Sequence, residues 1–167
     1  KAGLGAPGVK LERGRSWLPN LIGGVYMARK IVIKAVSNAP QDDREKFRLN
    51  DEWVCIANEG TTTENMEGWI LCTWKPDCRH YNQFYFPAEV HAYKMNFKPG
   101  QLIFVMTGSG RDTFLPAMEG HPGQFHFFMG LDHFIWDTPK DKVNLYSFKK
   151  DGHKEIYELV DQKEISG

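Results

Sequence analysis

The chain consists of short apolar runs separated by turn residues, and this spacing limits its fold more than any other feature of the sequence. Helical periodicity is weak throughout, whereas β-branched and aromatic residues are frequent within the runs. Such runs, bounded by Gly, Pro, Asn and Asp, predict an all-β chain folded as an immunoglobulin-like β-sandwich. The predicted strands cover residues 31–37, 52–58, 68–74, 84–87, 101–108, 124–130, 133–136, 142–148 and 153–160.

Alternation within the runs indicates which strands are central. Residues 52–58 place Trp53 and Cys55 on one face and Val54 on the other, so both faces are apolar. A strand that is apolar on both faces is typical of the centre of a sandwich. In the run at 124–130, alternation puts His126 opposite its two neighbouring phenylalanines, and we expect it on a solvent face.

The start of the chain differs from the rest in composition. Residues 1–26 are rich in glycine and follow no strand or helix period, which predicts an extended arm. The 167 residues therefore divide into this arm, a sandwich domain at 27–162 and a short tail at 163–167.

The charge is distributed unevenly although the net charge is zero. Residues 1–40 contain seven Lys and Arg residues and one Glu, out of 21 basic and 21 acidic residues in all. The remainder has 14 basic and 20 acidic residues, so a basic segment precedes an acidic body. Such a segment docks on its own domain, attaches to another chain to form an oligomer, or binds a nucleic acid. The basic residues assigned to this contact are Lys10, Arg13, Arg15, Arg29 and Lys30.

The sequence predicts no membrane span, because it has no apolar run of the roughly 18 residues that a spanning helix needs. Three cysteines are too few for a disulfide framework. We expect no cofactor. The chain begins at Lys1, and the compartment stays open.

Several short motifs follow one another in a recognisable order. They read N-D-E-W-V at 50–54 with an N-E-G turn after it, G-W at 68–69, F-P at 86–87, P-G before an apolar strand ending T-G-S-G, I-W at 135–136, and L-Y before a D-G hairpin. This order resembles the lamin-tail domain family over residues 31–160.

The resemblance implies an immunoglobulin-like β-sandwich without catalytic residues of its own. Members of the family occur at the tail of nuclear intermediate-filament proteins and in many bacterial and archaeal proteins, often beside hydrolases. The T-G-S-G-R-D-T stretch is more similar to the prokaryotic branch. On this resemblance we expect a binding or scaffolding module that contacts another protein or a nucleic acid.

The chain departs from the family pattern after Trp136. The family has N-x-x-G-D there, whereas this chain has D-T-P-K-D, with Lys140 in place of glycine and Asp141 as the retained acid. We expect the turn to be present but built differently. Features particular to this protein are expected in the long segments 75–83, 88–98 and 114–124.

Other motif residues have structural interpretations. Gly68 allows Trp69 to turn inward at the start of a strand, and Asn58 suits a turn because asparagine tolerates a positive φ. The Asp151-Gly152 pair predicts a tight hairpin. The residues assigned structural roles are Trp53, Asn58, Gly68, Trp69, Phe86, Pro87, Pro99, Gly100, Gly108, Trp136, Asp151 and Gly152.

Cysteine and histidine offer the main alternative chemistry. Cys72, Cys78 and His80 would supply three zinc ligands and make the chain a metal-dependent hydrolase, but a structural zinc site usually has closer spacing and a second pair. A Cys72–Cys78 or Cys55–Cys72 disulfide is another alternative. Unlinked thiols are the favoured interpretation.

The chain has more aromatic residues than one core readily hides, which predicts a binding surface. Such a surface would contact a partner chain or stack against sugars or bases. A carbohydrate-binding sandwich using Trp74, Tyr81 and Tyr85 is the corresponding alternative. The candidate aromatic residues are Trp74, Tyr81, Tyr85, Tyr93, Phe114 and Phe134.

Overall fold

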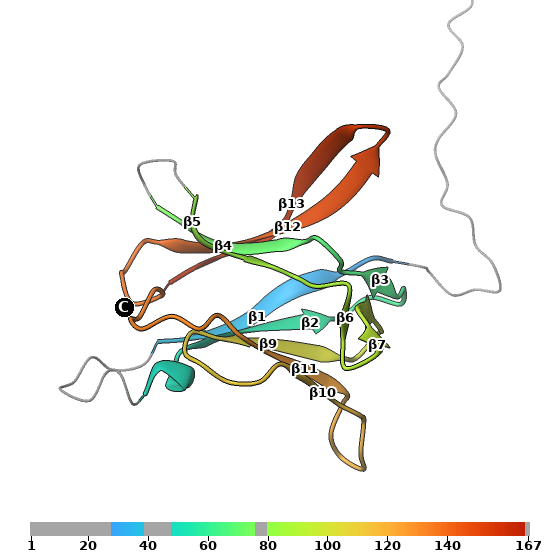
Figure 1. Cartoon of the computed structure of the whole chain (residues 1–167), viewed down its shortest axis with the longest axis horizontal. Coiled ribbons are helices and arrows are strands. Elements are labelled where there is room, and N and C mark those ends of the chain that lie inside the picture. Colours follow the sequence, from blue (N-terminus) through green and yellow to red (C-terminus); the bar gives the residue numbers. More distant parts are fainter. Residues whose placement is uncertain (1–27, 39–47, 76–79, 166–167) are drawn as a thin grey trace, which may run out of the picture.

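The computed structural model describes residues 28–38, 48–75 and 80–165 (Figure 1). Within these ranges the chain is built of strands, with a short 3-10 turn, η2 (Leu49–Asp51). The strands are β1 (Ile31–Ser37), β2 (Trp53–Asn58), β3 (Glu64–Asn65), β4 (Ile70–Trp74), β5 (His80–Tyr85), β6 (Glu89–Val90), β7 (Tyr93–Lys94), β8 (Asn96–Phe97), β9 (Leu102–Met106), β10 (Thr113–Leu115), β11 (Gln124–Phe128), β12 (Lys142–Asp151) and β13 (Lys154–Glu164).

Two sheets form the body of the fold. The first sheet has the order β1-β2-β9-β11-β10, and the second has the order β13-β12-β4-β5. Figure 1 shows the two sheets stacked, with the short pairs β3-β8 and β6-β7 at one end. The predicted all-β sandwich is therefore confirmed, and β2 is an interior strand of the first sheet, as its two apolar faces predict.

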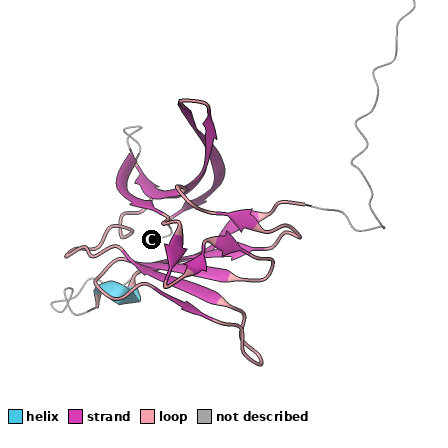
Figure 2. Ribbon diagram, turned by 45° about the vertical axis from the view of Figure 1, so that its right-hand side comes forward, coloured by secondary structure: helices cyan, strands magenta, loops and turns pink. Residues whose placement is uncertain are grey.

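The second sheet is bent. Its register shifts at Leu71/Thr73, between β4 and β5, and at Leu145/Tyr146, between β12 and β13. Irregularities of this kind bend a strand and increase its twist. Figure 2 shows the β12–β13 hairpin and the opposite ends of the sheet rising away from the first sheet. The outer face of the second sheet is therefore concave.

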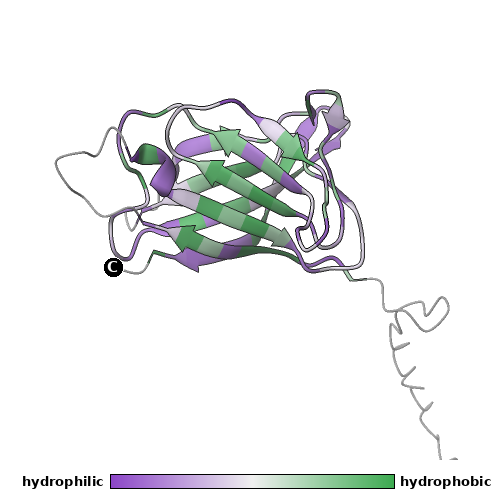
Figure 3. Ribbon diagram, turned by 90° about the horizontal axis from the view of Figure 1, so that it is seen from below, coloured by the Kyte–Doolittle hydropathy of each residue, from purple (hydrophilic) through white to green (hydrophobic). Residues whose placement is uncertain are grey.

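The core lies between the sheets and follows the alternation of the strands. Phe125 and Phe127 of β11 point inward and are buried, while His126 between them is only half-buried on the outer side, as predicted. Trp69 and Trp136 are buried in the same core. Figure 3 shows hydrophobic residues recurring along the strands of the sandwich. Each side chain of this size contributes about 1.5–3 kcal/mol when it leaves water.

Residues 133–136, predicted as a strand, form a loop instead. The carboxylate of Glu52, which is 0% exposed, accepts hydrogen bonds from the N–H groups of Ile135 at 3.1 Å and Trp136 at 2.6 Å. The Thr107 hydroxyl donates to the same carboxylate at 2.6 Å. Buried N–H groups need an acceptor, and here a side chain replaces the neighbouring strand. The strand prediction was wrong for this reason.

Three of the glycines assigned structural roles have a positive φ. Gly68 has a φ of +75°, and a Cβ atom there would lie 2.6 Å from Cδ1 of Phe148, so only glycine fits. Gly100 and Gly152 also have positive φ, at +80° and +60°. Gly152 closes the β12–β13 hairpin that the Asp-Gly pair predicts.

Asn58 has a different role from the one predicted. It is not among the residues with positive φ, and it is buried at the end of β2. Its side-chain amide donates to the carbonyls of Thr62 and Phe97, each at 2.8 Å, and its Oδ1 accepts from the Gly60 N–H at 3.0 Å. Asn58 therefore stabilises the turn through its side chain.

The turn after Trp136 is present and includes a left-handed residue. Lys140 has a φ of +74°, a conformation that favours glycine. Asp141 is 3% exposed; its N–H donates to the Thr138 carbonyl at 3.2 Å, and its carboxylate forms an ion pair with Lys75 at 3.2 Å.

The sandwich extends beyond the predicted boundary at residue 162. Strand β13 continues to Glu164, and Ile165 is 1% exposed with its N–H bonded to the Asp141 carbonyl at 2.9 Å. The predicted arm at 1–26 lies outside the described residues.

Candidate binding surfaces

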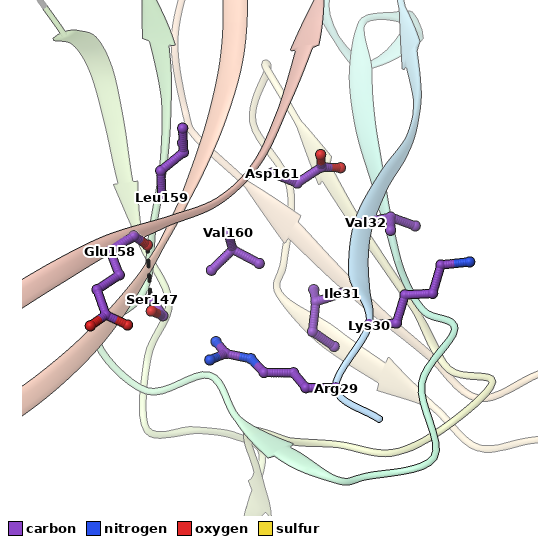
Figure 4. A pocket seen from close by; sticks show the side chains of 9 residues that line it. All are labelled: Arg29, Lys30, Ile31, Val32, Ser147, Glu158, Leu159, Val160 and Asp161. Carbon is purple, nitrogen blue, oxygen red and sulfur yellow. Dashed lines mark hydrogen bonds between the residues drawn. The ribbon is translucent and has the colours of Figure 1, made fainter. Parts of the chain in front are cut away.

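A groove runs between β1 and β13, at the edges of the two sheets (Figure 4). The strands meet where Asp161 Oδ2 accepts a hydrogen bond from the Ile33 N–H at 2.7 Å, and they separate toward the start of β1. The volume is about 350 Å³. This edge groove is lined by Arg29, Lys30, Ile31, Val32, Ser147, Glu158, Leu159, Val160 and Asp161.

The backbone of β1 presents hydrogen-bonding groups to the edge groove. On the β2 side, the carbonyls of Ala28 and Lys30 accept bonds from the N–H groups of Thr61 and Glu59, both at 2.9 Å. Successive residues of a strand direct their backbone groups to opposite sides, so those of Ile31 point into the edge groove. Strands β1 and β13 are not paired with each other in either sheet.

The basic side chains at the edge groove already have partners within the domain. Arg29 forms an ion pair with Glu64 at 3.5 Å and lies over the Trp69 ring at 4.8 Å. Lys30 pairs with Glu59 at 2.8 Å, which lowers the pKa of that carboxyl. Two of the five basic residues assigned to a partner contact therefore dock on their own domain, and Lys10, Arg13 and Arg15 lie outside the described residues.

A second surface lies on the concave outer face of the second sheet. Leu71 and Leu145 point into the core, so alternation places Ile70 and Tyr146 on the opposite face. A pocket of about 160 Å³ opens there. The lining residues of this tyrosine face are Ile70, Cys72, His80, Gln83, Tyr146 and Tyr157.

Four polar side chains form a chain of hydrogen bonds on the tyrosine face. Gln162 Nε2 donates to Asn144 Oδ1 at 2.8 Å, and Asn144 Nδ2 donates to Tyr146 Oη at 3.0 Å. Tyr146 Oη lies 2.8 Å from Nε2 of His80. These bonds fix the side chains without involving the backbone.

The predicted aromatic patch does not exist as one surface. Trp74 and Tyr85 lie on the outer side of the second sheet, whereas Tyr81 is paired with Thr73 on the inner side. Phe134 is 8% exposed and packs with Leu49, so its assignment to a binding surface was wrong.

The other two candidates lie together at a third groove. The rings of Tyr93 and Phe114 are 4.7 Å apart beside a groove of about 280 Å³. Lys94 and Lys98 also line this groove.

The cysteines are placed as core residues. Cys55 and Cys72 are buried free thiols, which excludes a Cys55–Cys72 disulfide, and burial raises the pKa of Cys72 to about 12. A thiol with so high a pKa is a poor metal ligand. Cys78 lies outside the described residues, within which no group of three His, Cys, Asp or Glu side chains is placed to hold a metal.

Sequence reasoning missed Tyr157 and Asp161, and it did not predict that Glu52 binds the 133–136 loop. For Tyr157 a signal was present, because the Asp-Gly hairpin sets the register that pairs it with Phe148. The partners of Glu52 and Asp161 are distant in sequence and follow no local pattern.

In comparisons with known proteins, no protein-family model matches the chain, and no curated protein matches it. Within the described ranges, no helix has the length and hydrophobicity that crossing a bilayer requires.

Proposed function

We propose that this chain is a non-catalytic β-sandwich module of the lamin-tail type, which holds an extended segment of a partner polypeptide in the edge groove. The observation that carries this proposal is the groove of about 350 Å³ beside Ile31, a residue whose backbone groups are directed away from β2 by alternation. An extended peptide adds to such an edge by main-chain hydrogen bonds, and side-chain pockets give specificity.

The turn at Lys140 supports the lamin-tail type. The family pattern has a glycine at this position, and the chain keeps the left-handed backbone that glycine would adopt, with a φ of +74°. The retained Asp141 is buried in the same turn. This backbone conformation supports the resemblance at a position where the sequence departs from the family pattern.

The shape of the edge supports a short docking segment. The register of β1 shifts between Ile33 and Ala35, where Lys34 is exposed, and Asp161 already accepts the Ile33 N–H. Bulges, lysines and side-chain caps are common means of blocking further strand pairing. The second half of β1 is thus closed, while the half that begins at Ile31 lines the edge groove.

Peptides selected from a random library on the immobilised chain test the proposal. Binding should slow hydrogen exchange of the Ile31 amide, which faces the edge groove, while the Val32 amide faces β2 and should change little. Peptides that leave Ile31 exchange unchanged, or a failure to select any binder, would contradict strand addition.

Two leucine variants locate the binding site. Leu159 lines the edge groove and is 52% exposed, so Leu159→Arg should keep the fold and weaken the selected peptides about tenfold or more. Leu115→Arg is the matched control, because Leu115 is also exposed but belongs to β10. Equal losses in the two variants would place the peptide elsewhere.

Deletion of residues 1–26 tests the part of the chain that precedes the described sandwich. The shortened chain should fold, because the described fold begins at residue 28. If the arm contributes to partner binding or assembly, its deletion weakens them. Unchanged assembly and unchanged binding after truncation would remove the arm from the proposal.

A further inference from the structure

The tyrosine face carries aromatic side chains where a solvent-facing sheet is normally polar. Tyr85 is 54% exposed and Tyr157 is 41% exposed, and both belong to the outer side of the bent second sheet. Exposed aromatic rings that border a pocket are a recognised mark of a binding site.

The two tyrosines are held in place by their neighbours. The Tyr157 ring packs against Phe148 with centroids 5.2 Å apart, and Tyr85 Oη donates to Gln83 Oε1 at 2.9 Å. The pKa of Tyr157 is raised by partial desolvation and then by the charges of Glu155 and Tyr85, which places the two tyrosines within electrostatic range of each other. Tyr157 therefore presents a ring surface at the pocket, and Tyr85 presents one beside it, on the strand partner of Ile70.

The polar groups at the pocket are also ordered in advance. Tyr146 Oη accepts a bond from Asn144, so its own hydrogen is free to go to Nε2 of His80. In that tautomer of His80 the other ring nitrogen, Nδ1, carries the hydrogen and would donate to a ligand oxygen. Gln83, at the same pocket, adds amide donors.

The size and charge of the pocket restrict its ligand. Its volume of about 160 Å³ is below the roughly 300 Å³ at which pockets for drug-sized ligands begin, so it fits one ring. Among the described residues, those that line it include no Lys, Arg, Asp or Glu. A charged ligand would lose its hydration there without gaining a counter-charge. The ligand is thus a neutral ring that combines apolar C–H faces with hydroxyl groups.

We propose that the tyrosine face binds a neutral saccharide, with a pyranose ring stacked on Tyr157 or Tyr85 and its hydroxyls bonded to His80 and Gln83. The tyrosine face and the edge groove share no lining residue, although Leu159 of the groove is the strand partner of Tyr146.

Titration of the isotope-labelled chain with neutral oligosaccharides, followed by heteronuclear NMR, tests the proposal. The probes are oligomers of glucose, mannose, galactose, xylose and N-acetylglucosamine, with oligogalacturonate as the charged comparison. At least one neutral series should shift the Tyr157, Gln83 and His80 resonances, and oligogalacturonate should not. The proposal would be overturned if no neutral sugar shifted these resonances, or if only a proline-rich peptide shifted them.

Variants then separate stacking from polar contacts. Tyr157→Ala and Tyr85→Ala should each weaken the identified sugar about tenfold, as loss of one stacking ring does, while Tyr157→Phe keeps most of the affinity. Tyr93→Ala is the matched control, since Tyr93 is 48% exposed but lies at another groove. Circular dichroism checks that each variant folds. If both alanine variants keep the affinity for the sugar, the saccharide proposal is overturned. The proposal that the edge groove binds a peptide is not affected by that result.

Discussion

The polar side chains around Glu52 and those around Tyr146 form two hydrogen-bond networks that differ in what they bond. Glu52 is 0% exposed and accepts from the backbone of Ile135 and Trp136. The network of Tyr146 joins side chains only, on the outer face of the second sheet.

The difference indicates which network the fold depends on. A buried backbone N–H must find an acceptor, so removing Glu52 leaves two N–H groups unpaired in the core. His80 and Tyr146 line a solvent-accessible pocket, where water replaces a lost partner, while Asn144 is 2% exposed. The first network therefore fixes the fold, while His80 and Tyr146 of the second are able to exchange partners with a ligand.

The largest expected effect is that of Glu52→Ala. It should lower the free energy of unfolding by about 3–5 kcal/mol, because it leaves buried donors without an acceptor. Urea denaturation measures the loss. Glu67→Ala is the control, because Glu67 is exposed and should change stability by less than about 0.5 kcal/mol. Similar losses in the two variants would remove the distinction between the networks.

Asn144→Ala should cost about 1 kcal/mol, since it removes two side-chain hydrogen bonds and leaves the backbone intact. The same denaturation experiment gives this value, and Gln162→Ala should cost less, because Gln162 is exposed at the end of the network. A loss as large as that of Glu52→Ala would show that the outer network also holds the fold.

Glu52→Gln tests the charge at the buried site. Burial raises the pKa of Glu52 above its ordinary value of 4.5, against the hydrogen bonds from Thr107, Trp136 and Ile135. The native state then binds more protons than the unfolded state above pH 4.5, so this group's contribution to stability falls as the pH rises through the native pKa. Gln keeps the acceptor oxygen and does not titrate.

The comparison of the two proteins isolates this titration, because their other groups are the same. From pH 4.5 upward, the wild type should lose stability relative to the Glu52→Gln variant. Urea denaturation at a series of pH values measures the difference. A constant difference would mean that the native pKa of Glu52 is not raised.

The sequence predicted the strands well because alternation and turn residues are local. The run at 31–37 coincides with β1, and Gly152 has the positive φ that the Asp-Gly hairpin indicates. The same local signals failed at 133–136, where an acceptor 83 residues away in sequence takes the N–H of Ile135.

The candidate surfaces were harder to predict, since each joins distant segments. The edge groove lies between β1 and β13, at opposite ends of the described chain, and no pattern within either strand indicates the other. The tyrosine face depends on register shifts at Leu71 and Leu145, which decide which aromatic rings share a pocket. Composition indicated a surplus of aromatic residues but not their grouping.

The smallest expected effect concerns the turn that follows the loop held by Glu52. Lys140 has a φ of +74°, which costs an L-residue about 1–2 kcal/mol. Replacement by glycine removes this cost, but part of the gain is lost because glycine has greater conformational freedom in the unfolded chain. Lys140→Gly should therefore raise the free energy of unfolding by about 0.5 kcal/mol. Lys140→Ala removes the same charge but keeps the Cβ atom, so it should give no gain in urea denaturation. A gain in both variants would assign the effect to charge, and the backbone of this turn would then not be under strain.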